Sequence, residues 1–211
     1  MIGNLRVLFV PFCGGAVAGS MTPLKWKRLA VWDNAERNKT VADLAEGLAT
    51  NARKALRKLG VKFKDVKLPE RVRQRVVILA ETAEQARRLG KLLPGWDLQD
   101  AIAVENEHED LEEVHPDGDK DPPPGRIATL VYAATYGINC DVLVRATAGT
   151  GKLSWGCIKN GGGRMGSTPA LVVDVEDQTG KREVKDSETR RREYKEQGLK
   201  ELTPTRETQN T

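Results

Sequence analysis

Two short apolar runs separated by a small-residue turn, within residues 126–147, constrain the fold of this chain more than any other feature. The runs, 127–131 and 142–144, are brief and aliphatic and do not alternate with polar residues. A strand buried on both faces of a parallel sheet has this pattern, because helices cover both of its sides. The turn between the runs, residues 132–139, is therefore predicted to lie at the carboxyl edge of the sheet, where open α/β sheets bind ligands.

Strand and helix patterns alternate through the rest of the chain. Besides the two central runs, strands are predicted at residues 5–10 (stopped by Pro11), 75–80, 101–104 and 170–175. Helices are predicted at residues 35–59, 83–93 and 186–197. Asn34 is the expected N-cap of the first helix, and Thr82 with Gln85 forms a capping box for the second. This alternation predicts an α/β fold with right-handed crossovers and a mostly parallel sheet flanked by helices.

Two segments fall outside this pattern. Residues 105–125 are acidic, contain three consecutive prolines and have little to bury, which predicts a flexible insertion. Its two histidines, His108 and His115, share no close ligand spacing, so no metal site is predicted. Residues 204–211 are expected to form a polar tail, which leaves one domain over residues 1–203.

Composition narrows the class of protein. The 211 residues, 39% hydrophobic and 30% charged, suffice for one soluble domain, and no apolar run approaches the roughly 20 residues of a membrane span. Cys13, Cys140 and Cys157 are odd in number and lack metal-ligand spacing, which indicates a reduced, cytoplasmic setting without a disulfide framework. The net charge of +4, with a pI near 9.0, favours a polyanionic partner.

Two basic stretches are candidates for binding such a partner. In residues 23–33, Lys25 and Arg28 are interleaved with tryptophans, a pattern that can stack on and neutralise a single nucleic-acid strand. The same stretch is equally suited to packing its tryptophans into the core. The end of the 35–59 helix is also basic, where charge complements the helix dipole and a solvated face is the simpler interpretation. Its basic residues are Arg53, Lys54, Arg57 and Lys58.

The order of these segments resembles the second RecA-like domain of superfamily 2 DNA and RNA helicases, the C-terminal half of their motor. Residues 26–38 resemble the start of that domain, where a basic-aromatic stretch leads to an Arg-Asn pair that opens a helix. Residues 76–96 resemble motif IV and the helix after it. Residues 129–139 resemble a loosened motif V, with Gly-Ile-Asn where the family usually has Gly-Leu/Ile-Asp. Gly163-Arg164 lies where motif VI and its arginine finger would fall.

This resemblance covers about residues 5–200 and implies a RecA-like three-layer fold. It also implies a part in ATP-dependent unwinding or translocation of nucleic acid. ATP and Mg²⁺ would be shared with a separate first RecA-like domain, because no Walker A loop or acidic Walker B strand precedes residue 126. In such motors the first domain grips the phosphates and the second supplies an arginine, so this chain is not expected to hydrolyse ATP alone.

The resemblance assigns catalytic and nucleotide-binding roles to four residues. Arg164 is the candidate arginine finger, and Arg145, at the end of a buried strand, is the substitute. The alternatives are a solvent-facing loop arginine for Arg164 and a structural salt bridge for Arg145. Gly137 and Asn139 are expected to contact the nucleotide.

Five residues are expected to contact the nucleic-acid backbone: Thr82, Thr129, Tyr132, Lys25 and Arg28. Hydroxyl and basic groups position a backbone without reading its sequence. The capping role of Thr82 is compatible with such a contact.

Two alternatives remain open. Residues 160–166 contain one Arg and four glycines in place of a tight motif VI helix, which suits a degenerate helicase fold kept as a binding module. Residues 146–153, Ala-Thr-Ala-Gly-Thr-Gly-Lys-Leu, approach a P-loop and follow a strand, which suits a stand-alone NTPase. Against the second, Leu153 cannot ligate Mg²⁺, and the sequence after it does not predict a helix that would face the phosphates.

Overall fold

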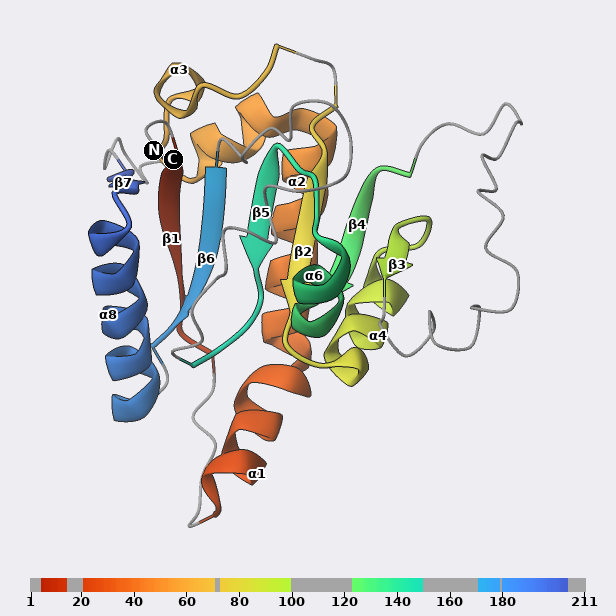
Figure 1. Cartoon of the computed structure of the whole chain (residues 1–211), viewed down its shortest axis with the longest axis vertical. Coiled ribbons are helices and arrows are strands. Elements are labelled where there is room, and N and C mark those ends of the chain that lie inside the picture. The colour runs from red at the N-terminus through yellow and green to blue at the C-terminus, as the bar shows by residue number, and fades with distance from the viewer. Residues whose placement is uncertain are drawn as a thin grey trace, which may run out of the picture.

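The computed structural model describes residues 5–14, 21–70, 73–99, 123–149, 171–178 and 180–204. They form a seven-stranded sheet with the order β3-β4-β2-β5-β6-β1-β7, in which every paired strand is parallel (Figure 1). The strands are β1 (Arg6–Phe12), β2 (Val76–Ala80), β3 (Asp97–Gln99), β4 (Gly125–Thr129), β5 (Val142–Arg145), β6 (Leu171–Asp177) and β7 (Lys200–Glu201). The predicted α/β class and parallel sheet are confirmed.

Helices cover both faces of this sheet. They are α1 (Pro23–Lys27), the π-helix η1 (Arg28–Trp32), α2 (Ala35–Lys58), α3 (Phe63–Val66), α4 (Ala83–Leu92), α6 (Leu130–Tyr136) and α8 (Lys181–Glu196). One hydrophobic core lies between the sheet and the pair α2 and α4, and a second between the sheet and the pair α6 and α8. No helix in the described ranges combines the length and apolar character needed to cross a membrane.

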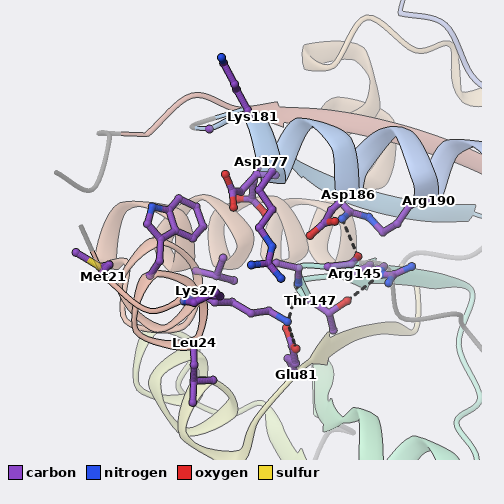
Figure 2. A pocket seen from close by; sticks show the side chains of 18 of the residues that line it. Met21, Leu24, Lys27, Glu81, Arg145, Thr147, Asp177, Lys181, Asp186 and Arg190 are labelled. Atoms are coloured by element: carbon purple, nitrogen blue, oxygen red, sulfur yellow. Dashed lines mark hydrogen bonds and ion pairs between the residues drawn. The ribbon is translucent and has the colours of Figure 1, made fainter. Parts of the chain in front are cut away.

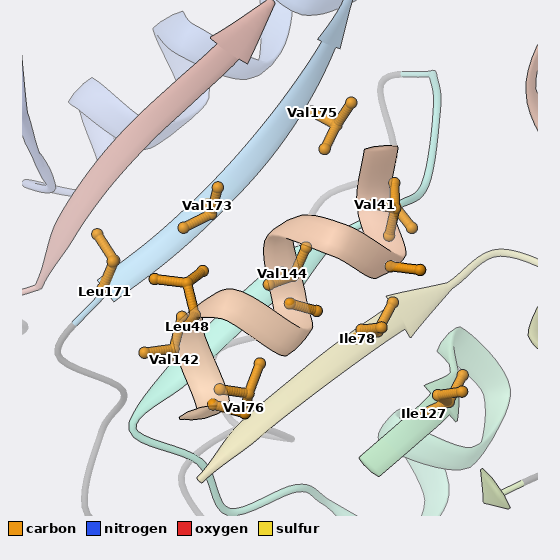
Figure 3. Close-up of a cluster of buried hydrophobic side chains, with 14 of the residues drawn as sticks. Val41, Leu48, Val76, Ile78, Ile127, Val142, Val144, Leu171, Val173 and Val175 are labelled. Carbon is orange, nitrogen blue, oxygen red and sulfur yellow. The ribbon is translucent and has the colours of Figure 1, made fainter. Parts of the chain in front are cut away.

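Alternate residues of each central strand feed the two cores. Ile78 packs in the first core with Val41 and Leu48 of α2 (Figure 3). Its neighbour Leu79 packs in the second core. All five residues of β2 are buried. This double burial is the physical reason for the unbroken apolar runs in the sequence.

The expected helix caps form. The Asn34 side chain accepts a hydrogen bond from the backbone N–H of Arg37 at 2.9 Å, and the Thr82 hydroxyl accepts one from Gln85 N–H at 3.1 Å. The side chain of Gln85 in turn accepts from the backbone N–H of Glu81 at 2.9 Å. Within α2, Asn51 leaves the helical region (φ −150°, ψ 77°), so the predicted continuous helix is interrupted there.

The predicted turn between the two central strands is wrong in part, because residues 130–136 form α6. The first strand ends at Thr129 instead of Val131, since the Thr129 hydroxyl accepts from the Tyr132 N–H at 3.1 Å and starts the helix. Gly137, with φ of 74°, ends α6. By Asp141 the chain has returned to the amino edge of the sheet, where its N–H donates to the carbonyl of Arg75.

Pro11 does not stop the first strand as predicted. β1 continues to Phe12, with Pro11 opposite Glu176 of β6. The carbonyls of Leu5 and Val7 accept from the β7 side, and alternation along the strand turns the backbone nitrogen of Pro11 to that same side. There β7 pairs only with Arg6 and Val7, so the missing N–H of Pro11 removes no hydrogen bond from the sheet.

Other boundaries also differ from the predictions. β6 runs on to Asp177, α8 starts at Lys181 instead of residue 186, and the short elements α3 and β7 were not predicted. Among the described residues the strand after α4 is β3, and the predicted strand 101–104 lies outside them. Residues 105–122 of the predicted insertion also lie outside them, and its predicted last residue, Gly125, is the first residue of β4. Cys13 and Cys140 are free thiols, and burial raises the pKa of Cys140 to about 12.

Candidate functional site

A cavity of about 740 Å³ lies at the carboxyl edge of the sheet. Its walls are the ends of β2, β5 and β6, helix α1 and the first turns of α8 (Figure 2). Charged side chains of both signs line it: Lys27, Glu81, Arg145, Asp177, Lys181, Arg182, Glu183, Asp186 and Arg190. This edge is where the topology of an open parallel sheet places a ligand.

Glu81, the residue after β2, connects three segments around the cavity. Its carboxylate pairs with Lys27 of α1, and the two side chains point toward one another in Figure 2. The indole N–H of Trp32 and the backbone N–H of Ala148 each donate to the same carboxylate at 3.3 Å. Glu81 therefore holds the basic-aromatic stretch against the end of the sheet.

Arg37 forms a second connection, at the start of α2. It is fully buried and binds Asp177 through two hydrogen bonds, Nε to Oδ1 at 2.6 Å and Nη2 to Oδ2 at 3.0 Å. Its Nη1 donates to the carbonyl of Ala146 at 2.8 Å, and the Gln85 amide donates to that oxygen at 3.1 Å. The start of α2 is thus fixed to the ends of β5 and β6.

A buried polar network lies beside these groups. Arg190 of α8 binds the carboxylate of Asp174 in β6 at 3.1 Å, and the Tyr194 hydroxyl donates to the same carboxylate at 2.8 Å. Arg145 donates to the hydroxyls of Thr147 at 2.7 Å and Tyr194 at 2.9 Å. Burial raises the pKa of Tyr194, so its hydroxyl stays protonated. The network docks α8 on the sheet.

Comparison with solved structures shows which fold this architecture belongs to. T4 UvsW is similar, with a TM-score of 0.59 and 14% identity over 95% of this chain. The fold is RecA-like. The chain spans 41% of the length of T4 UvsW, and at this identity the likeness shows the fold alone.

Weaker likenesses exist to two structures of Dbp5. The C-terminal domain of the DEAD-box protein Dbp5 has a TM-score of 0.47 and 14% identity, covering 96% of this chain and 92% of that one. S. cerevisiae Dbp5 L327V bound to RNA and ADP BeF3 has a TM-score of 0.43 and 12% identity, covering 95% of this chain and 42% of that one. At these TM-scores neither carries a structural argument. No protein-family model and no curated protein matches the chain.

The residues expected to act on the nucleotide are dispersed in this RecA-like domain. Arg145 lines the cavity, but it is 2% exposed and its guanidinium is engaged in the buried network. Gly137 and Asn139 lie between α6 and β5 and are not among the cavity-lining residues. Arg164 lies outside the described residues.

The two predicted threonines both cap helices in this RecA-like domain. Thr82 starts α4 and is partly exposed, whereas Thr129 starts α6 and is 3% exposed. Tyr132 is half-buried, and its ring lies 4.9 Å from that of Tyr136, centroid to centroid. Burial is the main cause that raises the pKa of Tyr132.

The basic-aromatic stretch forms α1 and η1. Lys25 is exposed on α1. Arg28 is exposed and forms ion pairs with Glu84 at 2.9 Å and Asp33 at 3.3 Å, and chiefly Glu84 raises its pKa. Both cations are therefore accessible to an anion, while Trp32 is occupied with Glu81.

The described part of the P-loop alternative, residues 146–149, follows β5 as such a loop requires. A phosphate-binding loop turns its backbone N–H groups toward the phosphates. Here the N–H of Ala148 donates to the Glu81 carboxylate instead, and a carboxylate at that position repels a phosphate. Residues 150–153, with Lys152, lie outside the described residues.

Sequence reasoning assigned no role to the side chains that organise this site. The resemblance used Arg37 and Glu81 only as parts of longer motifs. For α8 a signal was present, because four residues at helical spacing form its buried face: Glu183, Ser187, Arg190 and Tyr194. These residues are polar, so a search for apolar periodicity could not find that face.

A metal ion needs a group of ligand side chains placed close together. Across the described ranges, no group of three or more His, Cys, Asp or Glu side chains is placed to hold a metal ion. Asp174 and Asp177 are engaged by arginines. His108 and His115 lie outside the described residues.

Proposed function

We propose that this chain is the second motor domain of a superfamily 2 DNA or RNA helicase. It would bind nucleic-acid backbone and complete an ATP site on a separate first RecA-like domain. The observation that carries the proposal is the charged cavity at the carboxyl edge of a RecA-like sheet. The sequence resemblance to motifs IV and V supports it, because β2 and β4 end at this same edge.

The nucleotide would be shared between the two domains. Lys181 and Arg182 are exposed in the first turn of α8, where backbone N–H groups and the helix dipole also favour an anion. These groups suit the phosphates of ATP, whose terminal phosphoryl group is the one transferred. Mg²⁺ would be held by the first domain, since the carboxylates of β6 are already paired. Arg164 stays the predicted arginine finger.

The nucleic-acid contacts would come from α1 and η1, beside the cavity wall that Lys27 lines. Lys25 and Arg28 are exposed there, and a phosphate can replace Glu84 as the partner of Arg28 without breaking a buried contact. The partly exposed Thr82 lies at the start of α4, the helix that carries Glu84. Thr129 is buried, so its contribution would be to position α6 and the ring of Tyr132.

A binding module without a catalytic role is the second candidate. The observation that favours it is the engagement of Arg145 in the buried network, which leaves no substitute finger if Arg164 does not serve. The two candidates differ in ATP hydrolysis and agree in nucleic-acid binding.

Binding is tested with single-stranded DNA and RNA at low salt by fluorescence anisotropy. The variant Lys25→Ala/Arg28→Ala should weaken binding about tenfold or more, because phosphate contacts supply sequence-independent affinity. Lys185→Ala/Lys195→Ala removes the same charge from the exposed surface of α8 and is the control. No detectable binding by the unmodified chain at low salt would contradict the proposal.

ATP hydrolysis separates the remaining alternatives. The chain alone should show no turnover, whereas turnover that Lys152→Ala abolishes would establish the P-loop alternative. With a first RecA-like domain added, nucleic-acid-stimulated hydrolysis that Arg164→Ala lowers by about 10³-fold or more would establish the motor. Binding without any hydrolysis in that mixture would establish the binding module.

A further inference from the structure

The positive charge of this protein is concentrated in one segment. Residues 53–75 contain ten Lys and Arg and two acidic residues, a net charge of +8 in a chain whose total is +4. The rest of the chain is therefore net negative. Such segregation produces a local positive field that the net charge does not reveal.

The segment lies at the amino edge of the sheet, away from the cavity. It comprises the end of α2, helix α3 and the lead into β2, and Figure 1 shows α3 and α1 at opposite ends of the sheet. The Arg6 side chain, at the start of β1, donates to the carbonyl of Asp65 at 3.3 Å and attaches α3 to this edge. We call the exposed Lys and Arg side chains in the described part of this segment, residues 53–70 and 73–75, the amino-edge basic surface.

Buried apolar residues hold this surface in place. Val61, Val66 and Leu68 pack in the core beneath α2, while the intervening Lys62 and Lys64 are exposed. The cations thus project from a fixed backbone, and ordering them on a ligand costs only side-chain entropy.

Little in the described structure neutralises these cations. Arg53 lies 3.7 Å from Glu70, and Arg75 pairs with Asp141 at 3.0 Å. Across the described ranges, the other Lys and Arg side chains of the surface form no ion pair. The helix dipole accounts for basic residues in the last turn of α2 only, because its effect fades within a turn. Lys62, Lys64 and Arg73 lie beyond that turn.

Lys67 adds an independent observation, because its backbone is left-handed, with φ of 58° and ψ of 36°. It is the only non-glycine residue with positive φ in the described parts of the chain. This position follows α3, where glycine is the favoured residue. Strained positions of this kind cluster at functional sites, and here a lysine is kept where glycine would relieve the strain.

The chemistry of the surface favours nucleic acid over a membrane. None of the exposed large hydrophobic residues in the described structure lies in residues 53–75, so the described part of this surface offers a bilayer no large exposed apolar side chain. The exposed lysines and arginines on these neighbouring elements suit a phosphate backbone, which needs charge and no pocket.

We infer that the amino-edge basic surface is a second nucleic-acid-binding site, separate from the cavity. This inference does not require the chain to be a motor domain, since it rests on no residue of the cavity. An acidic protein segment is the competing occupant.

The test compares two triple charge reversals. Lys62→Glu/Lys64→Glu/Arg73→Glu changes the surface, and Lys185→Glu/Arg192→Glu/Lys195→Glu makes the same charge change on the exposed side of α8. Anisotropy with a labelled strand of about 20 nucleotides, longer than the sites of most single-strand binding domains, measures affinity against salt. The affinity of the surface variant should fall about tenfold or more. The slope of log K against log salt should become less steep by about 2. The affinity of the α8 variant should fall far less.

Lys67→Gly separates a loss of binding from a loss of folding, because it relieves the strained backbone while removing one cation. It should raise the melting temperature and weaken binding, a combination that unfolding cannot produce. Equal losses in both triple variants would reduce the effect to net charge and overturn the inference, as would an unchanged surface variant. Displacement by polyglutamate at a lower concentration than by unlabelled strand would assign the surface to an acidic protein instead. A loss in the surface variant with normal binding by Lys25→Ala/Arg28→Ala would uphold this inference and contradict the proposed function.

Discussion

At the residue scale, the pair formed by Arg37 and Asp177 is the most exacting contact in the site. Both side chains are buried, at 0% and 3% exposed. We expect Arg37→Met to lower the unfolding free energy by about 3–5 kcal/mol, because it leaves an uncompensated charge in the interior. Urea denaturation measures this, and Lys39→Ala, from an exposed pair with Asp43, should cost about 0.5 kcal/mol or less. Similar losses for the two variants would contradict this account.

Two glutamates should give stability opposite pH dependences. Hydrogen bonds from Arg191 lower the pKa of Glu176 below 4.5, so its contribution is present above pH 4.5 and is lost as the pH falls through the lowered pKa. Burial raises the pKa of Glu183 above 4.5, so its ionised form destabilises the fold as the pH rises through that range. Carboxyl groups titrate between about pH 3 and 7. As the pH rises through this range, Glu176→Gln should lose stability relative to the parent and Glu183→Gln should gain it. Parallel curves would exclude both effects.

At the scale of elements, side-chain caps set where the helices begin. Asn34→Ala and Thr82→Ala should each lower the unfolding free energy by about 1 kcal/mol, because each leaves a backbone N–H without its acceptor. The caps lie on different helices, so the double variant should lose the sum. Thr82→Ser retains the cap and is the control in chemical denaturation. Reduced nucleic-acid binding by Thr82→Ala but not by Thr82→Ser would add a binding role for the hydroxyl.

At the scale of the whole molecule, the central strand is buried on both faces. Ile78→Ala and Leu79→Ala should therefore each lower the unfolding free energy by about 2–5 kcal/mol, although adjacent residues of a strand face opposite sides. In a sheet with one wet face, one of the two changes would be nearly silent. Leu98→Ala on the edge strand β3, where the side chain is 38% exposed, should cost well under the smaller of these losses. Denaturation midpoints of the three variants decide the question.

The parts of this fold that follow from local chemistry were predictable from the sequence. Caps such as Asn34 and Thr82, and apolar runs such as 76–80, act over a few residues and leave a clear pattern. The start of α6 was missed because Leu130 and Val131 extend the apolar run of β4, while the Thr129 hydroxyl turns them into a helix. The continuation of β1 through Pro11 depends on how far β7 extends on its other side, which no local pattern records.

The site was less predictable than the fold. Its location at the carboxyl edge followed from the strand pattern, but its organisation depends on pairs that are distant in sequence. Arg37 meets Asp177 and Lys27 meets Glu81 only once the sheet has formed. A buried arginine has the same one-letter signature as an exposed one, so only the fold distinguishes them. Arg145 illustrates this, because the alternative to a finger was a structural salt bridge, and in the fold its guanidinium lies 3.9 Å from the Asp174 carboxylate and donates to Thr147 and Tyr194.

Pro11 has a consequence for how this protein behaves at high concentration. It lies on the outer side of β1, where β7 is only two residues long and, among the described residues, no strand pairs on that side beyond Val7. A free backbone donor at such an edge invites a strand from another molecule, and proline removes that donor. Pro11→Val should therefore leave the sheet intact and promote self-association. Sedimentation velocity over a concentration series should show the parent remaining a single species while the variant forms larger ones.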